Sequence, residues 1–226
     1  MKVLLFGATG MVGQGVLREC LLADDVTSVV TVGRTRVQAD HPKLRQIVHE
    51  DLYDYRAVES ELTPFDACFF CLGTSSAGKT EAQYRRVTFD LTMAVASTLA
   101  RLNPSMVFVY GSGAGADSSG AGPVMWAKVR GQTENALQKL PFRAVYAFRP
   151  GVIQPLHGAT SKTRAYRVFY SLTRPLLPIV RKLFPKFVLT TVTIGQAMLN
   201  TVRYGAPKTV LEAADIQERS QPPRVG

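Results

Sequence analysis

The sequence has few of the residues that build metal centres, disulfide frameworks or membrane spans. It contains only three cysteines and three histidines, and the histidines show no metal-ligand spacing. No apolar run approaches the length needed to cross a bilayer. The first residues faintly resemble a secretory signal, but glycines interrupt them and no small-residue cleavage site follows. These absences predict a cytoplasmic protein without a metal site.

Two of the cysteines, Cys68 and Cys71, form a C-x-x-C pattern inside an apolar run. Strand residues alternate between the two faces of a sheet, so positions three apart point in opposite directions. We therefore expect buried thiols here and not a redox pair.

Acidic residues are missing from one long stretch of the chain. Between Glu134 and Glu212 there are twelve lysines and arginines and no acid, whereas the remainder has fifteen basic and seventeen acidic residues. The net charge of +10 therefore lies in the C-terminal third. This charge suits an acidic protein partner or an anionic membrane surface, although we favour a solvated face over an apolar core side. No nucleic-acid-binding module accompanies it, so no nucleic acid is expected. The residues concerned are Lys162, Arg164, Arg167, Arg174, Arg181, Lys182 and Lys186.

Strand-like and helical patterns alternate through most of the sequence. With 226 residues and 46% hydrophobic content, the chain is long enough for one domain with a full core. Alternation of this kind indicates βαβ units and a parallel sheet. Strands are predicted over residues 3–6, 28–32, 44–49, 66–72, 106–110, 142–148 and 209–211. Helices are predicted over residues 12–21, 54–61, 80–101, 128–137, 164–172 and 193–202, with a flexible stretch over 111–122.

A glycine-rich turn joins the first predicted strand to the first helix. Gly7, Gly10 and Gly13 follow each other at a spacing of three. The first glycine allows a tight turn, the second lets a pyrophosphate approach the backbone, and the third lets helix and strand pack closely. The N–H groups and the dipole of the helix then face the anion. This pattern predicts a doubly wound, mostly parallel Rossmann sheet, with a dinucleotide held by Gly7, Thr9, Gly10, Met11, Val12 and Gly13.

The end of the second predicted strand indicates which dinucleotide binds. An acid there accepts the 2′-hydroxyl of NAD, whereas an arginine favours the 2′-phosphate of NADP. The sequence has Arg34 at this point and no acid before Asp40, which favours NADP(H). The alternative is a solvated turn arginine. Asp51 and Leu52, after the third strand, are placed to meet the adenine ring.

Several motifs in order resemble one protein superfamily. They are the glycine turn, Asp51-Leu52, the CLGT motif at 71–74, the RPG motif at 149–151 and the AMLNTVR segment at 197–203. Together they resemble an extended or atypical short-chain dehydrogenase/reductase. Within it the chain is similar to the branch that contains the HIV Tat-interactive protein and its oxidoreductase-like relatives. The resemblance covers nearly the whole chain and implies one NAD(P)-binding domain over 1–226, with a small substrate-side lobe over 152–226. It further implies cofactor contacts from Leu72, Gly73, Thr74 and Pro150.

The resemblance also implies a catalytic serine, tyrosine and lysine, with the tyrosine four residues before the lysine. The serine polarises a carbonyl, and the lysine binds the nicotinamide ribose and lowers the pKa of the tyrosine that donates the proton. Ser112 and Lys128 match the first and last of these residues, and Lys128 would hold the ribose. Val124 stands where the tyrosine is expected, and valine has no proton to donate.

No neighbour of Val124 restores the missing proton donor. A shift of one or two residues brings in Pro123, Met125 or Trp126, none of which is an acid. The remaining candidates for a substitute donor are Ser118, Ser119 and Tyr110.

Three functions are compatible with these residues. The first is an NADP(H)-dependent reductase that exchanges hydride with an unknown small carbonyl or alcohol. Its substrate would enter between residues 71–76, Ser112 and the C-terminal lobe. The second is a cofactor-sensing regulatory or scaffold protein with little turnover, which Val124 favours. The third, a nucleotide-sugar epimerase, ordinarily also needs the missing tyrosine.

Overall fold

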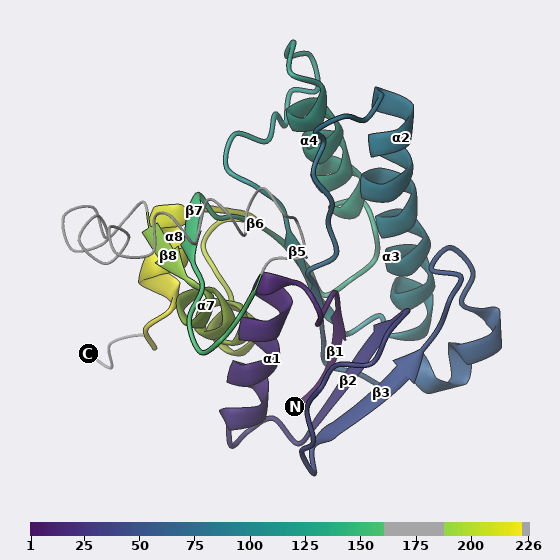
Figure 1. Ribbon diagram of the computed structural model, residues 1–226, viewed down its shortest axis with the longest axis vertical. Helices are drawn as coiled ribbons and strands as arrows, with labels where there is room; N and C mark the ends of the chain where they lie inside the picture. The colour runs from purple at the N-terminus through teal and green to yellow at the C-terminus, as the bar shows by residue number, and fades with distance from the viewer. Residues whose placement is uncertain (161–187, 223–226) are drawn as a thin grey trace.

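The apolar runs of the sequence form a seven-stranded sheet in which every pair of neighbours is parallel (Figure 1). The computed structural model describes residues 1–160 and 188–222. Its strand order is β3-β2-β1-β4-β5-β6-β9, which reverses direction beside β1 and confirms the predicted doubly wound α/β fold. The strands are β1 (Lys2–Phe6), β2 (Ser28–Gly33), β3 (Leu44–Val48), β4 (Ala67–Phe70), β5 (Val107–Gly111), β6 (Ala144–Arg149) and β9 (Val210–Glu212).

The central strands are buried on both faces, which explains their continuous apolar character. Val3 and Leu5 of β1 belong to one core cluster, and Leu4 and Phe6 belong to the other. All four side chains are fully buried. The alternation of neighbours between two cores follows from the period of two in a strand.

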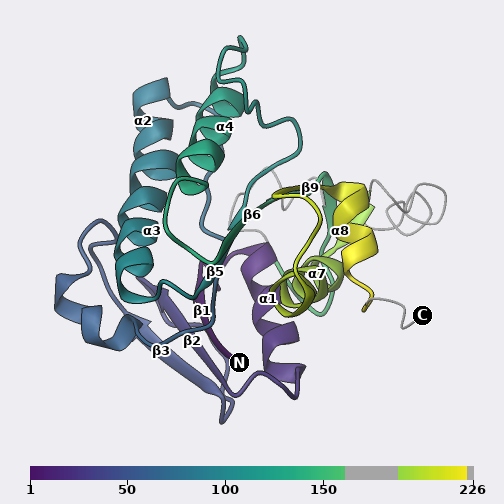
Figure 2. The same ribbon diagram turned by 180° about the vertical axis from the view of Figure 1, so that it is seen from behind.

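Helices cover both faces of the sheet, as Figures 1 and 2 show from opposite sides. The face that carries Val3 and Leu5 packs on the first group of helices, and the other face packs on the second. The first group is α1 (Met11–Leu22), α7 (Thr191–Tyr204) and α8 (Ala213–Arg219). The second is α3 (Leu91–Leu102) and α4 (Met125–Leu137), while α2 (Glu81–Arg85) packs against α4.

The helix predicted over 80–101 has an irregular middle. Thr80 caps its start through a capping box with Gln83. A π-helical turn, Arg86–Asp90, then joins α2 to α3. The helix predicted over 54–61 is a 3₁₀ helix, Arg56–Leu62. These departures concern the hydrogen-bond pattern of the backbone, which side-chain periodicity does not specify.

Three short elements go beyond those predicted from the sequence. Strands β7 (Val152–Gln154) and β8 (Val188–Thr190) pair as a separate two-stranded sheet, and α8 follows β9. Each is too short for its periodicity to stand out. The helix predicted over 164–172 and the seven basic residues from Lys162 to Lys186 lie outside the described residues. The lobe over 152–226 therefore stays a prediction, while β9 itself extends the main sheet through β6.

Helices α1 and α7 cross in close contact. A Cβ built on Gly15 would lie 2.5 Å from the Cβ of Thr191, and one built on Gly195 would lie 2.7 Å from Cγ of Glu19. The missing side chains of these two glycines let the helices approach. Through the described residues, no helix has both the length and the apolar character that a membrane crossing requires.

Candidate cofactor and active site

Backbone atoms pack closely against two glycines of the turn at the end of β1. Gly7 has φ +82°, a conformation that favours glycine, and its carbonyl accepts a hydrogen bond of 2.9 Å from Gly10 N–H. A Cβ on Gly7 would lie 2.6 Å from the carbonyl of Cys71, where β4 ends. One on Gly13 would lie 2.1 Å from the Gly7 oxygen. Gly7 and Gly13 therefore have the tight-turn and close-packing roles that the sequence predicts for them.

The N-terminus of α1 is available to an anion. Gly10 is its N-cap residue and makes no side-chain cap, and the first turn contains no acidic residue. The N–H groups of Met11, Val12 and Gly13 have no acceptor within the helix, since the first bond to Gly10 O comes from Gln14. This end of α1 lies at the carboxyl edge of β1, beside the point where the strand order reverses.

Two clefts adjoin the turn and share three lining residues, Arg34, Leu52 and Leu72. The first, of about 340 Å³, is also lined by Gly7, Thr9 and Val32. Arg34 is exposed and, among the described residues, forms no ion pair. Its guanidinium is therefore free of a competing carboxylate at the place where the sequence predicts the adenosine ribose.

The second cleft, of about 490 Å³, continues from the first along the ends of β3 and β4. Its lining contains the predicted cofactor residues Asp51, Gly73 and Thr74, and the acidic Glu50 as well. The Asp51 carboxylate accepts a hydrogen bond of 2.9 Å from the N–H of Tyr53, which fixes the turn after β3. The residues predicted to meet the adenosine end of a dinucleotide thus lie along one continuous depression.

Ser112 is buried at the end of β5. Its hydroxyl donates to Oε1 of Glu134 over 2.5 Å, and its N–H donates to the Phe148 carbonyl over 2.8 Å. Glu134, which is 2% exposed, is also bound by the guanidinium of Arg149 through both carboxylate oxygens. The predicted catalytic serine thus belongs to a buried polar cluster, and its proton is already directed to a carboxylate.

The loop after β5 is anchored on two sides. Asp117 N–H donates to Ala127 O on α4 over 2.9 Å, and Ala114 N–H donates to Pro150 O over 3.1 Å. A Cβ on Gly131 would lie 1.7 Å from Asp117 O, so the loop packs directly on α4. The stretch over 111–122, predicted to be flexible, is therefore held in place. Pro150 contributes to this anchoring through its carbonyl.

Lys128 and Arg130 project from different sides of α4. Residues two positions apart on an α-helix are separated by about 200° around its axis. The Nζ of Lys128 lies 3.0 Å from the Glu81 carboxylate on α2. Arg130 instead donates from Nε to the Tyr84 hydroxyl over 3.0 Å and from Nη1 to the Gly111 carbonyl over 3.2 Å. Arg130 therefore reaches the carboxyl end of β5, and the prediction for Lys128 as a ribose ligand stays a prediction.

The residues weighed as proton donors have different surroundings. Val124 is the exposed N-cap residue of α4. Tyr110 is 1% exposed, and burial raises its pKa to about 12. Ser118 accepts from Arg149 over 2.5 Å, and Ser119 donates to Asp117 over 2.6 Å. The two serines are therefore exposed but already hydrogen-bonded to other side chains, and Tyr110 is enclosed in the core.

The three cysteines are free thiols. Cys68 belongs to the core cluster on the face of the sheet that packs on α3, whereas Cys71 packs against the cluster on the opposite face. Burial raises the pKa of the Cys71 thiol to about 12. The two cysteines thus lie on opposite faces of the sheet, as predicted. Cys68 is buried as expected, whereas Cys71 is only partly buried.

Sequence reasoning overlooked Arg130. It stands four residues after Trp126, which is the spacing expected between the tyrosine and the lysine, but a search for tyrosine and lysine does not find this pair. A search for any aromatic residue followed four positions later by any cationic residue would find this pair. The contacts of Ser112 and Arg149 with Glu134 had no comparable signal, because these residues meet only in the folded chain.

Comparison with known proteins places this geometry in a family. The profile of the NAD dependent epimerase/dehydratase family matches residues 3–183. "Protein fmp52, mitochondrial" of Emericella nidulans is 33% identical over 159 residues, covering 67% of this chain and 66% of that protein. "Protein HTATIP2" of Rattus norvegicus is 27% identical over 155 residues, covering 67% of this chain and 62% of that protein. The alignments thus span slightly less than two thirds of these relatives. They confirm the resemblance drawn from the motifs.

Solved structures with NAD(P) bound share the fold. The Bordetella bronchiseptica enzyme WbmF, in complex with NAD+, superimposes with a TM-score of 0.67 at 15% identity, covering 97% of this chain and 77% of WbmF. Gre2 of Candida albicans, in complex with NADPH, has a TM-score of 0.70 at 13% identity, covering 94% and 77%. At these identities the likeness concerns the fold alone.

The expected cytoplasmic location is wrong by this comparison. Fungal relatives, among them those of Emericella nidulans and Eremothecium gossypii, have the word mitochondrial in their names. These names contradict the expectation of a cytoplasmic protein. The lack of secretory and membrane-spanning patterns does not exclude mitochondria, because mitochondrial targeting uses amphipathic, arginine-rich segments without a long apolar run.

Proposed function

This chain belongs to the NAD dependent epimerase/dehydratase family, and from that premise we propose that it binds NADP(H) and acts as a reductase on a small carbonyl or alcohol. The observation that carries the proposal is the glycine cradle beside the Arg34 cleft. Bound NADP(H) supplies a hydride, and the residues of the chain bind, orient and shield the reacting groups.

The glycine turn suits the charge of a pyrophosphate. Gly7 and Gly13 let the backbone pack closely, which holds the turn and the start of α1 in place. The uncapped N–H groups of α1 offer hydrogen bonds to anionic oxygens. Met11, Val12 and Gly13 would donate these bonds, because the N–H of Gly10 is already bonded to the Gly7 carbonyl, and Thr9 lines the first cleft.

Arg34 supports NADP over NAD. A guanidinium binds a phosphate by two parallel hydrogen bonds and stays charged at every physiological pH. Arg34 lies at the end of β2, where the ribose of the adenosine half is expected. Glu50 and Asp51 line the second cleft and would oppose a phosphate placed there, so the preference depends on the phosphate lying in the first cleft, which Arg34 also lines.

Replacing Arg34 by alanine tests the cofactor preference. Since hydrogen bonds to a charged group contribute roughly 1.5–3 kcal/mol each, NADPH affinity should fall about tenfold or more while NADH affinity changes little. Isothermal titration calorimetry with both cofactors measures this effect. Arg36→Ala is the matched control, since Arg36 is also exposed but lines neither cleft. Equal NADPH binding by wild type and Arg34→Ala would refute the preference.

The reactive centre would be assembled at the ends of β4 and β5. Ser112 would orient the substrate oxygen after turning its hydroxyl away from Glu134. The negative charge of Glu134 would still be neutralised by its ion pair with Arg149. In this proposal Lys128 remains the candidate ribose ligand from the sequence. Arg130 is a second candidate cation, and it already lies at the end of β5.

A specific observation favours a second function, a cofactor-sensing protein with little turnover. Val124 cannot donate a proton, and neither Trp126 nor Arg130 is an acid near neutral pH. A screen of aldehydes, ketones and quinones for NADPH oxidation separates the two functions. Sustained oxidation that Ser112→Ala abolishes would establish the reductase, whereas tight binding without oxidation would support the sensor.

A further inference from the structure

Arg130 has a guanidinium that is held rigidly but carries an unpaired charge. Its Nε donates to the Tyr84 hydroxyl and its Nη1 to the Gly111 carbonyl, at 3.0 and 3.2 Å. Both acceptors are neutral. Tyr84 is 1% exposed, so its buried phenol fixes the position of the Arg130 guanidinium. The two bonds orient the planar group without neutralising it.

No carboxylate in the described part of the chain forms an ion pair with Arg130. The nearest acid along α4 is Glu134, one turn further on. Its two oxygens are already bound by Arg149 and Ser112. A partly buried cation without a counter-ion is unfavourable, because two hydrogen bonds to neutral acceptors replace only part of the hydration that burial removes. An anionic ligand would restore the balance.

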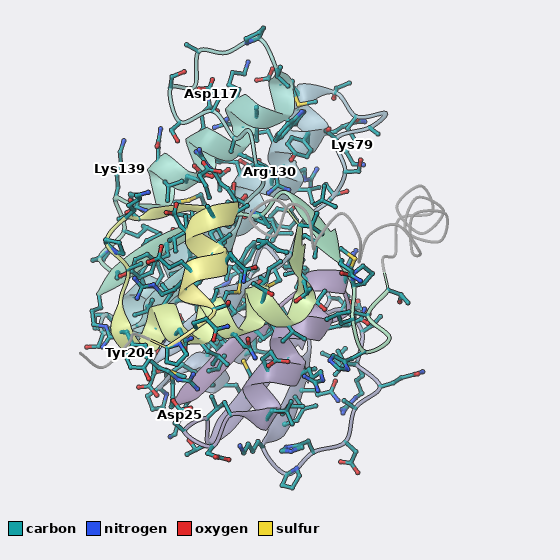
Figure 3. All side chains as sticks on the ribbon, turned by 90° about the vertical axis from the view of Figure 1, so that its left-hand side faces the viewer. Asp25, Lys79, Asp117, Arg130, Lys139 and Tyr204 are labelled. Carbon is teal, nitrogen blue, oxygen red and sulfur yellow. The ribbon has the colours of Figure 1, made fainter. Side chains whose placement is uncertain are left out.

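The free end of the guanidinium points to the carboxyl edge of the sheet. A Cβ built on Gly73, just after β4, would lie 3.7 Å from Nη2, and one on Gly113 would lie 3.9 Å from Nε. Glycines at both places leave the guanidinium without a covering side chain. Figure 3 labels Arg130 on α4 and shows Asp117 in the loop above it. Ligands of open α/β sheets bind at this edge.

We propose that Arg130 binds the acidic group of the substrate, so that the substrate is a small carbonyl or alcohol compound carrying a carboxylate. The Nη2 group and the second hydrogen of Nη1 form a fork that matches the two oxygens of a carboxylate. Tyr84 is a positioning residue that holds this fork. The inference rests on the proposed function, because the acid would be held beside the bound cofactor.

Binding of a charged probe and its neutral match tests this site without relying on turnover. Pyruvate and methyl pyruvate are titrated calorimetrically into protein saturated with NADP+. Wild type should bind pyruvate more tightly than the ester. Arg130→Gln should weaken pyruvate binding about tenfold or more, the effect of losing a charged hydrogen-bond pair, and leave the ester unchanged. Arg130→Lys should retain part of the affinity, since lysine keeps the charge but loses the fork.

The matched control is Lys139→Gln, which removes one positive charge from the segment just after α4. Lys139 is exposed and follows the C-terminal end of α4. The pyruvate affinity of the Lys139→Gln variant should equal that of wild type. Trp126, the single tryptophan and one turn before Arg130, gives a second readout, because pyruvate should change its fluorescence and the ester should not.

Separate outcomes overturn the two proposals. If wild type binds neither NADP+ nor NADPH, the proposed function fails, and pyruvate binding is then measured on the protein alone. Equal affinity of wild type for pyruvate and its ester overturns the role of Arg130. So does an Arg130→Gln variant that loses NADP+ affinity but keeps pyruvate affinity, because Arg130 would then serve the cofactor. If Arg130→Gln does not fold, unchanged pyruvate affinity in Arg130→Lys overturns the fork.

Discussion

Cys68 on β4 is a fully buried thiol. Burial, together with the neighbouring Cys71, raises its pKa well above the usual value. In the unfolded chain the thiol loses its proton near its ordinary pKa of about 8.5. Above that pH the unfolded state binds fewer protons than the folded state, so the free energy of unfolding should fall as the pH rises.

Replacing Cys68 by alanine should make this alkaline loss shallower. One group titrating only in the unfolded state accounts for at most about 1.4 kcal/mol per pH unit. Urea unfolding under reducing conditions from pH 7 to 10 measures the slope. The cavity left by the substitution lowers stability at every pH and therefore leaves the slope unaffected. Identical slopes for the wild type and the variant would show that burial does not keep the Cys68 thiol protonated in the folded state.

At the scale of elements, the contact between Glu134 and Arg149 joins α4 to β6. The Glu134 carboxylate is buried, and Arg149 also reaches Glu212 at the end of β9 over 3.1 Å. The Glu134 carboxylate, through Arg149, therefore connects α4, the helix that bears Arg130, to the ends of β6 and β9. Removing one partner of such a pair leaves a buried charge uncompensated.

Glu134→Ala should lower the free energy of unfolding by about 3–5 kcal/mol. The double variant Glu134→Leu with Arg149→Met should lose less, because no buried charge is left alone. Lys128→Gln is the comparison, since its ion pair with Glu81 is largely exposed and contributes less than about 1 kcal/mol. Chemical unfolding measures all three. A loss for Glu134→Ala no larger than that for Lys128→Gln would contradict the interpretation.

Elements with strong local patterns could be predicted from the sequence. Strands β1, β2, β4, β5 and β6 are predicted because their apolar runs are buried on both faces and end in turn residues, whereas β3 comes from a shorter and more exposed run. The glycine turn and Arg34 are predicted because their chemistry lies within a few neighbouring residues. Strands β7 and β8 are too short to show a pattern, and the π-helical turn at Arg86–Asp90 depends on backbone bonding.

The reactive part of the site is less predictable. A motif search assigns the cation by residue type, and it therefore selects Lys128 and misses Arg130. The direction in which each side chain leaves α4 decides which of them reaches the end of β5, and two residues change that direction by about 200°. Ser112 is found from its place after β5, but its bond to Glu134 depends on the packing of α4 against β6.

At the scale of the whole molecule, the C-terminal part of the chain supports the N-terminal phosphate site. Helix α7 packs on α1, whose first turn faces the predicted pyrophosphate. The contact is made through glycines, since a Cβ on Gly15 would lie 2.8 Å from the Thr191 carbonyl oxygen. The position of α1, and with it the anion site, therefore depends on residues nearly the whole chain length away.

Gly15→Ala tests this dependence. The added methyl group would collide with the backbone of Thr191 and push α1 from α7, at a cost of about 1–3 kcal/mol as for other overpacked contacts. NADP+ affinity should fall with stability, because the N–H groups of α1 move with the helix. Arg203→Ala is the control, since it removes the partly exposed ion pair between α7 and Asp25, just after α1, and a hydrogen bond to Asn200, without adding an atom between the two helices. Thermal unfolding and NADP+ calorimetry on both variants measure the effect. If the Gly15→Ala and Arg203→Ala variants had the same thermal stability and the same NADP+ affinity, α7 would cover α1 without positioning it.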